Sequence, residues 1–488
     1  MGQRLFEGMT AKTRLCVTCV FWLVCVLAVP GAGAQAVSVT PTNPAIAAGQ
    51  TQQFTATGNL TPSLVSASGS HTCALEPDRT VRCWGYNQYG QLGDGTTTDS
   101  STPVSVAGLT NAITVAAGHH HTCALMTDGT LRCWGSNQYG QLGDGSPLDG
   151  TNHDAHIPVA VSGITNAVAV IPGAYHTCAL LADGTVRCWG DNDFGELGDG
   201  TNTSSSTAVA VTGLAAAPTV VTAGGFHTCA VLPDGAVQCW GRNDFGQLGD
   251  GDTPDSSTPV GVIGLGPVAA LSAGGYHNCA LMPDGTLRCW GRNNFGQLGD
   301  GSSLTYLISS NNQGLIGIYN STLLPGSISR TPVEVANIST ATAAIAGGFH
   351  TCALLADGSV KCWGENDDGQ LGNGSSTSSS TPVSVIGLPP VAAVSAGAWH
   401  TCARLPDGTV QCWGMNLYGQ LGNGTTTDSE TAVAVTGSGP VTWTSSDTAV
   451  ATIDAATGLA TARSPGSTTI TATATGASGS TLLTVVNQ

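Results

Sequence analysis

The fold is decided by residues 113–146, which read ITVAAGHHHTCALMTDGTLRCWGSNQYGQLGDGS. This unit occurs seven times along the 488 residues, and a Cys-Trp-Gly tripeptide marks each copy, with tryptophan at positions 84, 134, 189, 240, 290, 363 and 413. Successive tryptophans are 50, 55, 51, 50, 73 and 50 residues apart. Self-similarity at so long a period, with glycine-rich turns, is typical of a repeat architecture.

Each copy is expected to fold as four short strands. In the second copy the strands are predicted over residues 113–117, 121–126, 130–134 and 158–161, where β-favouring residues lie between turns without helical periodicity. Four strands per unit fit a blade of a β-propeller, and closing the ring removes the sheet edges that an open array would expose. The expected fold class is therefore all-β, with a seven-bladed propeller over residues 61–439.

Two cysteines recur in every copy, always ten residues apart. Between Cys279 and Cys289, the sequence Pro283-Asp284-Gly285 has the composition of a three-residue hairpin loop. That loop places the two cysteines opposite each other on paired strands, within reach of a disulfide. A zinc site is the alternative, but its cysteines are usually two to four residues apart. We therefore predict seven local disulfides: Cys73–Cys83, Cys123–Cys133, Cys178–Cys188, Cys229–Cys239, Cys279–Cys289, Cys352–Cys362 and Cys402–Cys412.

The unit HTCAL…DG…CWG…GQLG resembles the repeat of the regulator-of-chromosome-condensation family, whose members are seven-bladed propellers. The resemblance covers about residues 61–439 and rests on seven agreeing copies. The family includes a nuclear exchange factor for a small GTPase, a plant photoreceptor and a secreted inhibitor of an enzyme. Two cysteines per repeat are a feature of secreted bacterial members, so the resemblance implies an extracytoplasmic binding protein.

Two flanking segments resemble the halves of one bacterial immunoglobulin-like domain of group 2. Residues 37–58 contain NPAIAAGQTQQFTATG and are expected to form two strands. Residues 441–486 contain VTWTSSDTAVATID and STLLTV and are expected to form about five. About 22 residues cannot bury a core alone, whereas both segments together make a small sandwich. We therefore expect the propeller to be inserted into the sandwich formed by residues 37–60 and 440–488; a linker plus an incomplete domain is the alternative.

The N-terminus is predicted to be a signal peptide, residues 1–36. Basic residues precede an apolar run over residues 15–29, which is shorter than a membrane span, and small residues follow it. Cleavage is expected after Ala36 or Ala34, and an uncleaved anchor is the alternative. Cleavage would leave an even number of cysteines, as expected of an oxidised secreted protein. We expect a secreted or extracytoplasmic chain, cell-surface associated or free, without a membrane span after cleavage.

Composition excludes several functions. The chain has 14 Lys and Arg, 31 Asp and Glu and a formal net charge of -17, so it lacks the basic surface on which duplex nucleic-acid binding rests. The sequence contains no Gly-x-Ser-x-Gly elbow or phosphate loop, and every cysteine of the expected mature chain has a predicted partner. We therefore predict no enzyme activity, no cofactor, no metal and no nucleic-acid partner, and a monomer.

Several repeated polar positions have both a functional and a structural interpretation. A histidine recurs at 71, 121, 176, 227, 277, 350 and 400, and blade-to-blade hydrogen bonds are favoured over a metal-binding or pH-sensing ring. Basic residues at 82, 132, 187, 288 and 361 are expected to lie along the blade surface, not to bind an anion. The Gly-Asp-Gly and Gly-Asn-Gly turns lack the clustered acidic ligands of a calcium loop, so a turn-stabilising role is favoured.

The departures from the repeat indicate where a partner binds. The spacing of 73 residues contains an apolar insertion near residues 302–330. Such an insertion is either a packed loop or a contact surface. The candidate partner surface is Tyr306, Leu307, Ile308, Leu315, Ile316, Tyr319 and Leu323. The first hypothesis is a non-catalytic exported scaffold that presents its loops to a protein or surface glycan. The alternatives are an extracellular lyase or hydrolase with its site in the propeller mouth, and a purely structural surface module.

Overall fold

The structure is a computed structural model, and it describes residues 38–57, 64–302, 327–474 and 477–486. These residues form strands and turns, with no α-helix among them. Within the described ranges there is accordingly no apolar helix long enough to cross a bilayer. The predicted signal peptide and the candidate partner surface between residues 303 and 326 lie outside the described residues.

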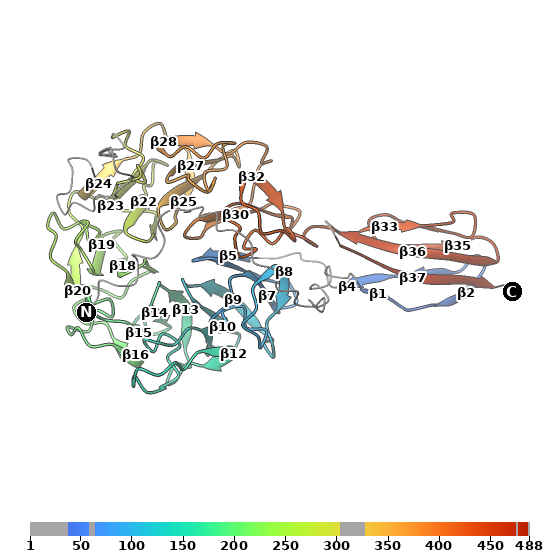
Figure 1. The fold of residues 1–488 in the computed structure, drawn as a ribbon, viewed down its shortest axis with the longest axis horizontal. Helices are drawn as coiled ribbons and strands as arrows, with labels where there is room; N and C mark the ends of the chain where they lie inside the picture. The colour runs from blue at the N-terminus through green and yellow to red at the C-terminus, as the bar shows by residue number, and fades with distance from the viewer. Residues whose placement is uncertain (1–37, 58–63, 303–326, 475–476, 487–488) are drawn as a thin grey trace, which may run out of the picture. The chain divides into compact units, whose positions relative to one another are not determined.

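Twenty-eight strands form seven antiparallel four-stranded sheets, and each sheet contains one copy of the repeat (Figure 1). The first three blades are β5 (Leu64–Ser68), β6 (His71–Leu75), β7 (Val81–Gly85) and β8 (Ser100–Ser105); β9 (Ala112–Ala117), β10 (His121–Met126), β11 (Leu131–Gly135) and β12 (Ala155–Ala160); and β13 (Ala167–Pro172), β14 (His176–Leu181), β15 (Val186–Gly190) and β16 (Ser205–Ala210).

The remaining blades repeat the same order. They are β17 (Val220–Ala223), β18 (His227–Val231), β19 (Val237–Gly241) and β20 (Ser256–Gly261); β21 (Ala270–Ala273), β22 (His277–Leu281), β23 (Leu287–Arg292) and β24 (Ile328–Glu334); β25 (Ala341–Ala346), β26 (His350–Leu355), β27 (Val360–Gly364) and β28 (Ser379–Ser384); and β29 (Ala393–Ala396), β30 (His400–Arg404), β31 (Val410–Gly414) and β32 (Ser429–Ala434).

The seven sheets close into a ring. The first strand of each blade contacts the first strand of the next, and β29 of the last blade contacts β5 of the first. Figure 1 shows the sheets arranged around a common axis, from blue β5 to orange β32. Because the last blade has a neighbour on both sides, none of the blade faces is left open at a seam.

The hairpin between the second and third strands has the register expected from the sequence. Cys123 is opposite Cys133, and Leu125 is opposite Leu131 on the same face. All seven cysteine pairs are disulfides, with Cα atoms 4.0 to 4.1 Å apart. Each disulfide ties one hairpin of one blade and crosses no blade boundary.

The core lies between blades. Trp134 of the second blade is fully buried and packs with Leu75, Val81 and Leu92 of the first. The same arrangement recurs around the ring, and all seven repeat tryptophans are among the largest fully buried side chains. The tryptophans are therefore structural, because each anchors its blade to the preceding one.

Residues at both ends of the chain form a second, sandwich-like set of sheets. One sheet has the order β2 (Ala45–Ala47), β37 (Ala477–Val486), β36 (Gly466–Ala474), β33 (Thr442–Ser445); another has β3 (Thr51–Gln53), β35 (Leu459–Ala462), β34 (Ala451–Ile453); and β1 (Ser38–Thr40) pairs with β4 (Thr55–Thr57). The N-terminal segment thus contains four short strands where two were expected. Pro41 and Pro44 cannot donate backbone hydrogen bonds, so β1 ends and β2 begins around them.

The two segments share one core. β2 runs parallel to β37 with Ala45 opposite Thr484, and β3 runs antiparallel to β35 with Thr51 opposite Thr461. Figure 1 shows blue β1 and β2 beside red β36 and β37. Phe54 is 1% exposed, and its ring centroid lies 6.4 Å from that of Trp443. The apolar core of this domain therefore depends on residues nearly 390 positions apart.

Candidate functional site: an aromatic collar at the channel mouth

The propeller has two chemically different ends. Since the four strands of a blade are antiparallel, the first-to-second and third-to-fourth connections lie at one end and the second-to-third hairpin lies at the other. Backbone hydrogen bonds join the first-to-second corners of neighbouring blades, such as Gly275 N–H to Gly347 O at 3.0 Å and Ala398 N–H to Gly69 O at 3.1 Å. We call this end the collar end and the other the hairpin end.

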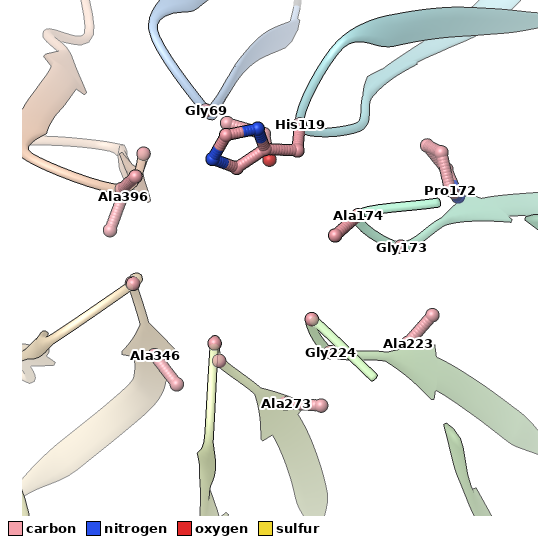
Figure 2. A pocket seen from close by; sticks show the side chains of 18 residues that line it. Gly69, His119, Pro172, Gly173, Ala174, Ala223, Gly224, Ala273, Ala346 and Ala396 are labelled. Atoms are coloured by element: carbon pink, nitrogen blue, oxygen red, sulfur yellow. The ribbon is translucent and has the colours of Figure 1, made fainter. Parts of the chain in front are cut away.

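The central channel is lined at the collar end by small residues. Alanines and glycines from the ends of the first strands surround it, and His119 is the imidazole among them (Figure 2). The enclosed space has a volume of about 80 Å³. Ligand pockets for drug-sized molecules have volumes of about 300 Å³ or more. The channel itself is therefore too narrow for a substrate of that size, and no carboxylate is among the described residues that line it.

The recurring histidines lie away from the channel and link the blades. The Nε2 atom of His71 is 2.8 Å from Oγ1 of Thr122 in the next blade, and His400 makes the same contact with Thr72 across the ring closure. The seven bonds join the pairs His71–Thr122, His121–Thr177, His176–Thr228, His227–Asn278, His277–Thr351, His350–Thr401 and His400–Thr72, at 2.8 to 3.0 Å. We call this closed set the histidine latch.

The partners of the latch fix the protonation of its imidazoles. The Thr122 hydroxyl donates to the backbone oxygen of Gln91, so it must accept from Nε2–H of His71. In the fifth blade Asn278 replaces threonine; its amide donates to Gln247 O, which leaves its side-chain oxygen to accept from His227. Both arrangements require a proton on Nε2, which either a neutral imidazole or a charged imidazolium can supply. Because the side chains are buried, the neutral imidazole is the favoured form.

Burial lowers the pKa of every latch histidine. The pKa falls from its usual value of about 6.5 to about 3 for His71, His121, His176, His277 and His400 and to about 4 for His227 and His350. Desolvation is the largest cause in each case, because the imidazolium would lose its hydration. The latch is therefore a neutral structural network, not a solvent-facing metal or proton-binding ring.

Seven aromatic and imidazole rings form a closed circuit at the collar end. They are His119, His120, Tyr175, Phe226, Tyr276, Phe349 and Trp399, and we call them the aromatic collar. Successive ring centroids are 4.2, 6.2, 5.6, 5.6, 5.9 and 6.4 Å apart, and 6.0 Å separates Trp399 from His119 where the circuit closes. These separations are typical of interacting aromatic pairs.

A second layer of rings supports the collar from outside. The Tyr-Gly or Phe-Gly of the third-to-fourth connection places one ring against a collar ring in five blades. The pairs are Tyr89–His120, Tyr139–Tyr175, Phe194–Phe226, Phe245–Tyr276 and Phe295–Phe349, with centroids 5.0 to 5.9 Å apart and planes tilted by 54° to 85°. Edge-to-face packing of this kind holds the collar rings in fixed orientations.

His119 completes the circuit at the position where the first blade has Ser70 in place of a ring. The residue before the latch histidine is aromatic in blades three to seven and histidine in the second, but it is Ser70 in the first. His119 extends from the second blade between Tyr175 and Trp399, and its Nδ1 lies 2.9 Å from Nε2 of His120. Burial lowers the pKa of His119 to about 4, so it is neutral at physiological pH.

Two arginines and several buried carboxyl groups flank the collar. The guanidinium carbon of Arg242 lies 4.7 Å from the Phe194 centroid, and that of Arg292 lies 5.1 Å from the Phe245 centroid. Burial raises the pKa of Asp191 to about 6 and that of Glu365 to about 8. Burial also raises the pKa of Glu196 well above its usual range, with Asp191 adding to the effect.

The other repeated polar positions have structural roles in the described residues. Nη1 of Arg288 donates to the backbone oxygen of Gly264 at 3.2 Å, at the hairpin end. Asp94 accepts from both the amide and the hydroxyl of Thr96, at 2.9 and 2.8 Å, which fixes its turn. Across the described ranges, no group of three or more His, Cys, Asp or Glu side chains is arranged to hold a metal ion.

Sequence reasoning did not find the aromatic collar. The signal was present, because the residue before each latch histidine is aromatic in five copies and the residue before Gly in the GQLG motif is aromatic in six. What the sequence could not show is that these two positions, about 20 residues apart, meet in space. Their meeting depends on both connections leaving the blade at the same end.

The fold defines a ring-shaped repeat protein with a closed circuit of aromatic and imidazole rings at one end, in which Phe226 and Tyr276 are buried. Sequence comparison assigns its class: the family model of the RCC1-like domain matches residues 31–309, more than half of the chain, so the chain belongs to this family. Models of the regulator of chromosome condensation repeat match residues 284–354, 357–404 and 391–420. The group 2 bacterial Ig-like domain matches residues 421–485.

Individual relatives share only part of their length with this chain. The ultraviolet-B receptor UVR8 of Arabidopsis thaliana is 30% identical over 198 residues, which are 40% of this chain and 33% of the receptor. The probable E3 ubiquitin-protein ligase HERC4 of Homo sapiens is 36% identical over 116 residues, 23% of this chain and 11% of the ligase. The chain thus spans a third or less of these relatives.

Solved structures share the fold. Yeast RCC1 (Prp20), in its complex with Kap60, superposes with a TM-score of 0.62 at 22% identity, covering 77% of this chain and 85% of that one. Human WBSCR16 gives a TM-score of 0.62 at 20% identity, covering 73% of this chain and 94% of the other. Membership in this family supports a binding or scaffold role, and the seven disulfides and the Ig-like domain fit an extracellular protein.

Proposed function

We propose that this protein is an exported, non-catalytic scaffold that binds a protein or surface-glycan partner through its collar end. The observation that carries the proposal is the closed aromatic circuit. Aromatic residues and arginine are enriched in the centres of interfaces, where they supply large contact areas at a small entropic cost. A ring whose blades are joined by the histidine latch and the buried tryptophans is a suitable support, because its contact residues are ordered before binding.

The lengths of the third-to-fourth connections also favour the collar end as the binding face. Most third-to-fourth connections have about the same length, but those between β11 and β12 and between β23 and β24 are longer, and both belong to the collar end. Ser302 and Ser327 bound the longer insertion. Varied loops on a constant framework are where binding specificity usually resides. The apolar residues proposed as a partner surface from the sequence fall within that insertion and remain part of the proposal.

The rival hypotheses make different demands on the same surface. A lyase or hydrolase would need convergent acid and base groups, whereas the described channel lining is small and apolar and the latch histidines are buried. A purely structural surface module would need no collar at all. The proposal includes that the protein is a secreted or surface-associated monomer without a nucleic-acid partner.

Affinity capture with matched variants tests the proposal. The mature protein is immobilised and exposed to extracellular fractions of its source, alongside Tyr175→Ala/Trp399→Ala and the control Ile263→Ala. Tyr175 and Trp399 belong to the collar, whereas Ile263 is 49% exposed in a fourth-to-first connection at the hairpin end. We expect the wild type and the control to capture the same partner and the collar variant to lose it. Equal capture by all three proteins would overturn the proposal.

A further inference from the structure

The charges of the propeller are distributed unequally between its two ends. The third-to-fourth connections contain eighteen acidic residues, and the collar end has three basic residues, Arg242, Arg292 and Arg330, among the described residues. The acidic residues are Asp94, Asp99, Asp144, Asp149, Asp154, Asp191, Asp193, Glu196, Asp199, Asp244, Asp250, Asp252, Asp255, Asp300, Glu365, Asp367, Asp368 and Asp428.

The hairpin end is close to neutral by comparison. Its acidic residues are Glu76, Asp78, Asp128, Asp183, Asp234, Asp284, Glu334, Asp357 and Asp407, and the basic residues in or beside its hairpins are Arg79, Arg82, Arg132, Arg187, Arg288, Lys361 and Arg404. Since the two ends are built from the same seven repeats, the general acidity of the chain does not explain the difference. The excess of negative charge therefore lies in the third-to-fourth connections, apart from Glu196 and Glu365, whose raised pKa values keep them largely protonated at neutral pH.

Two of the collar-end arginines, Arg242 and Arg292, show that the rings accept planar cations. The guanidinium of Arg242 lies within 5.8 Å of four ring centroids, those of Phe194, Phe226, Phe245 and Tyr276. Its Nε and Nη2 atoms also donate to Asp244, at 3.0 and 2.6 Å. Arg292 lies at 5.1 to 5.6 Å from four rings of the next sector. Planar cations over aromatic faces with a carboxylate beside them are thus already part of this surface.

We propose that the collar end binds a cationic protein segment, whose Lys or Arg side chains stack on the aromatic collar inside its acidic rim. This inference rests on the proposed function and names the chemistry of the partner. Tyr175 and Trp399, which no arginine of the described residues covers, offer rings of the same kind as those that hold Arg242 and Arg292. The acidic rim attracts such a segment from a distance and accelerates its association.

The charge pattern favours this partner over the other macromolecules. A nucleic acid or a sulfated or uronic glycan would be repelled by the rim. A neutral glycan could stack on the rings but would gain nothing from the negative charge of the rim. A cationic segment uses both features, the rings through cation–π contacts and the rim through charge attraction.

Fluorescence anisotropy with defined peptides tests the inference. The probe is a labelled twelve-residue peptide of alternating Gly and Arg, and its control replaces each Arg with citrulline, which keeps the planar shape without the charge. We expect the Arg peptide to bind at least about tenfold more tightly than the citrulline peptide at low salt. The affinity should fall several-fold when salt is raised to physiological concentration, because the Debye length shortens to about 8 Å.

Two pairs of variants locate the binding site on the protein. Trp399→Ala should weaken binding by about fivefold or more if the rings hold the cations, whereas Ile263→Ala at the hairpin end should not change it. Asp193→Asn/Asp367→Asn neutralises two exposed rim residues and should weaken binding at low salt. Asp234→Asn/Asp407→Asn removes the same charge from the hairpin end and should leave the affinity unchanged.

Three results would overturn the inference: equal binding of both peptides, equal loss from the rim and hairpin-end charge variants, or no binding at low salt. These outcomes are distinguishable from failure of the proposed function. If the captured partner is lost with Tyr175→Ala/Trp399→Ala but is a neutral glycan or an acidic protein, the binding role stands and the cationic specificity is wrong. If capture does not depend on the collar, the proposed function itself is wrong.

Discussion

At the scale of single residues, the repeats act as controls for one another. Glu196 is the residue of interest in the third blade, because the other six copies have glutamine at its position. Its Oε2 accepts from the Phe194 amide at 3.0 Å, as Oε1 of Gln141 accepts from the Tyr139 amide at 2.9 Å. Oε1 of Glu196 is buried and has no partner among the described residues. A protonated Glu196 therefore imitates glutamine.

We predict that Glu196→Gln stabilises the protein increasingly as the pH rises. Burial raises the pKa of Glu196 in the folded state above the unfolded value near 4.3, so its contribution to stability is present below that value and is lost as the pH rises toward the folded pKa. Glutamine does not titrate. Urea unfolding at pH 4 and pH 8 should show little difference at pH 4 and a gain at pH 8; a loss at pH 8 would contradict this interpretation.

Arg79 is a second informative exception. It stands where the other six hairpins have glycine, and its φ is +67°, as expected for a left-handed position. We predict that Arg79→Gly raises the unfolding free energy by about 0.5–1 kcal/mol, the steric relief exceeding the entropy that glycine gains in the unfolded chain. Arg79→Ala keeps the strain and should give no gain. Chemical denaturation of both variants checks the prediction, and a lower midpoint for Arg79→Gly would refute it.

At the scale of elements, the histidine latch joins each second strand to its neighbour in the next blade. The backbone carbonyl that accepts a hydrogen bond from the latch threonine also accepts one from the repeat tryptophan. For example, Gln91 O accepts from Oγ1 of Thr122 at 2.9 Å and from Nε1 of Trp134 at 2.9 Å. One backbone oxygen in each blade thus holds two side chains of the next. This explains why His, Thr and Trp recur together.

The latch makes a pH dependence predictable. The folded pKa values of its histidines, about 3 to 4, lie below the unfolded value near 6.5, so the unfolded state binds more protons and stability falls as the pH drops through this window. Each histidine contributes a slope of about 1.4 kcal/mol per pH unit. Five carboxyl groups with raised pKa values oppose this trend, namely Asp99, Asp191, Glu196, Asp255 and Glu365, whereas His119 and His120 act in the same direction as the seven latch histidines.

We therefore predict a falling melting temperature from pH 6.5 to pH 4 by calorimetry. His277→Gln, which keeps a donor for Thr351, should reduce the slope of unfolding free energy against pH, whereas His153→Gln, outside the latch, should not. A flat or rising melting temperature over this range would show that the imidazoles are not held neutral.

Much of the element level could be predicted from sequence. The cysteine spacing determined the hairpin register because a ten-residue separation leaves one in-register pairing around a three-residue loop. The four strands per blade and the blade-to-blade hydrogen bonds of the recurring histidines also followed from the repeat. The N-terminal segment was harder, because strands of three residues interrupted by Pro41 and Pro44 leave little periodicity to recognise.

The collar could not be predicted by the same means. Tyr276 and Phe245 belong to different blades, and Phe349 and Tyr276 touch only because the ring brings successive corners together. The role of His119 is even harder to predict. No feature of the sequence around His119 indicates that its ring takes the place of one missing at Ser70, which is 49 positions away. Such contacts depend on the curvature of the whole ring, which a single repeat does not encode.

At the scale of the whole molecule, the second domain depends on both ends of the chain. We predict that deleting residues 38–57 unfolds residues 441–486 and leaves the disulfide-tied propeller intact, because β2 and β3 pair with β37 and β35, and β1 and β4 pair with each other around Phe54. Phe54→Ala should cost this domain about 3–5 kcal/mol. Hydrogen exchange resolved by segment measures both; a fragment of residues 440–488 that folds alone would disprove the shared core.

The central claim is that the aromatic collar is the binding face of the propeller. Hydroxyl-radical footprinting tests it most directly, because it reads the solvent access of individual aromatic side chains with and without the captured partner. If the collar is the binding face, oxidation of Tyr175, Phe349 and Trp399 falls when the partner binds. Oxidation of Ile263 and Ile386 at the hairpin end then stays the same with and without the partner. Unchanged oxidation of the collar, with protection at the hairpin end, would contradict it.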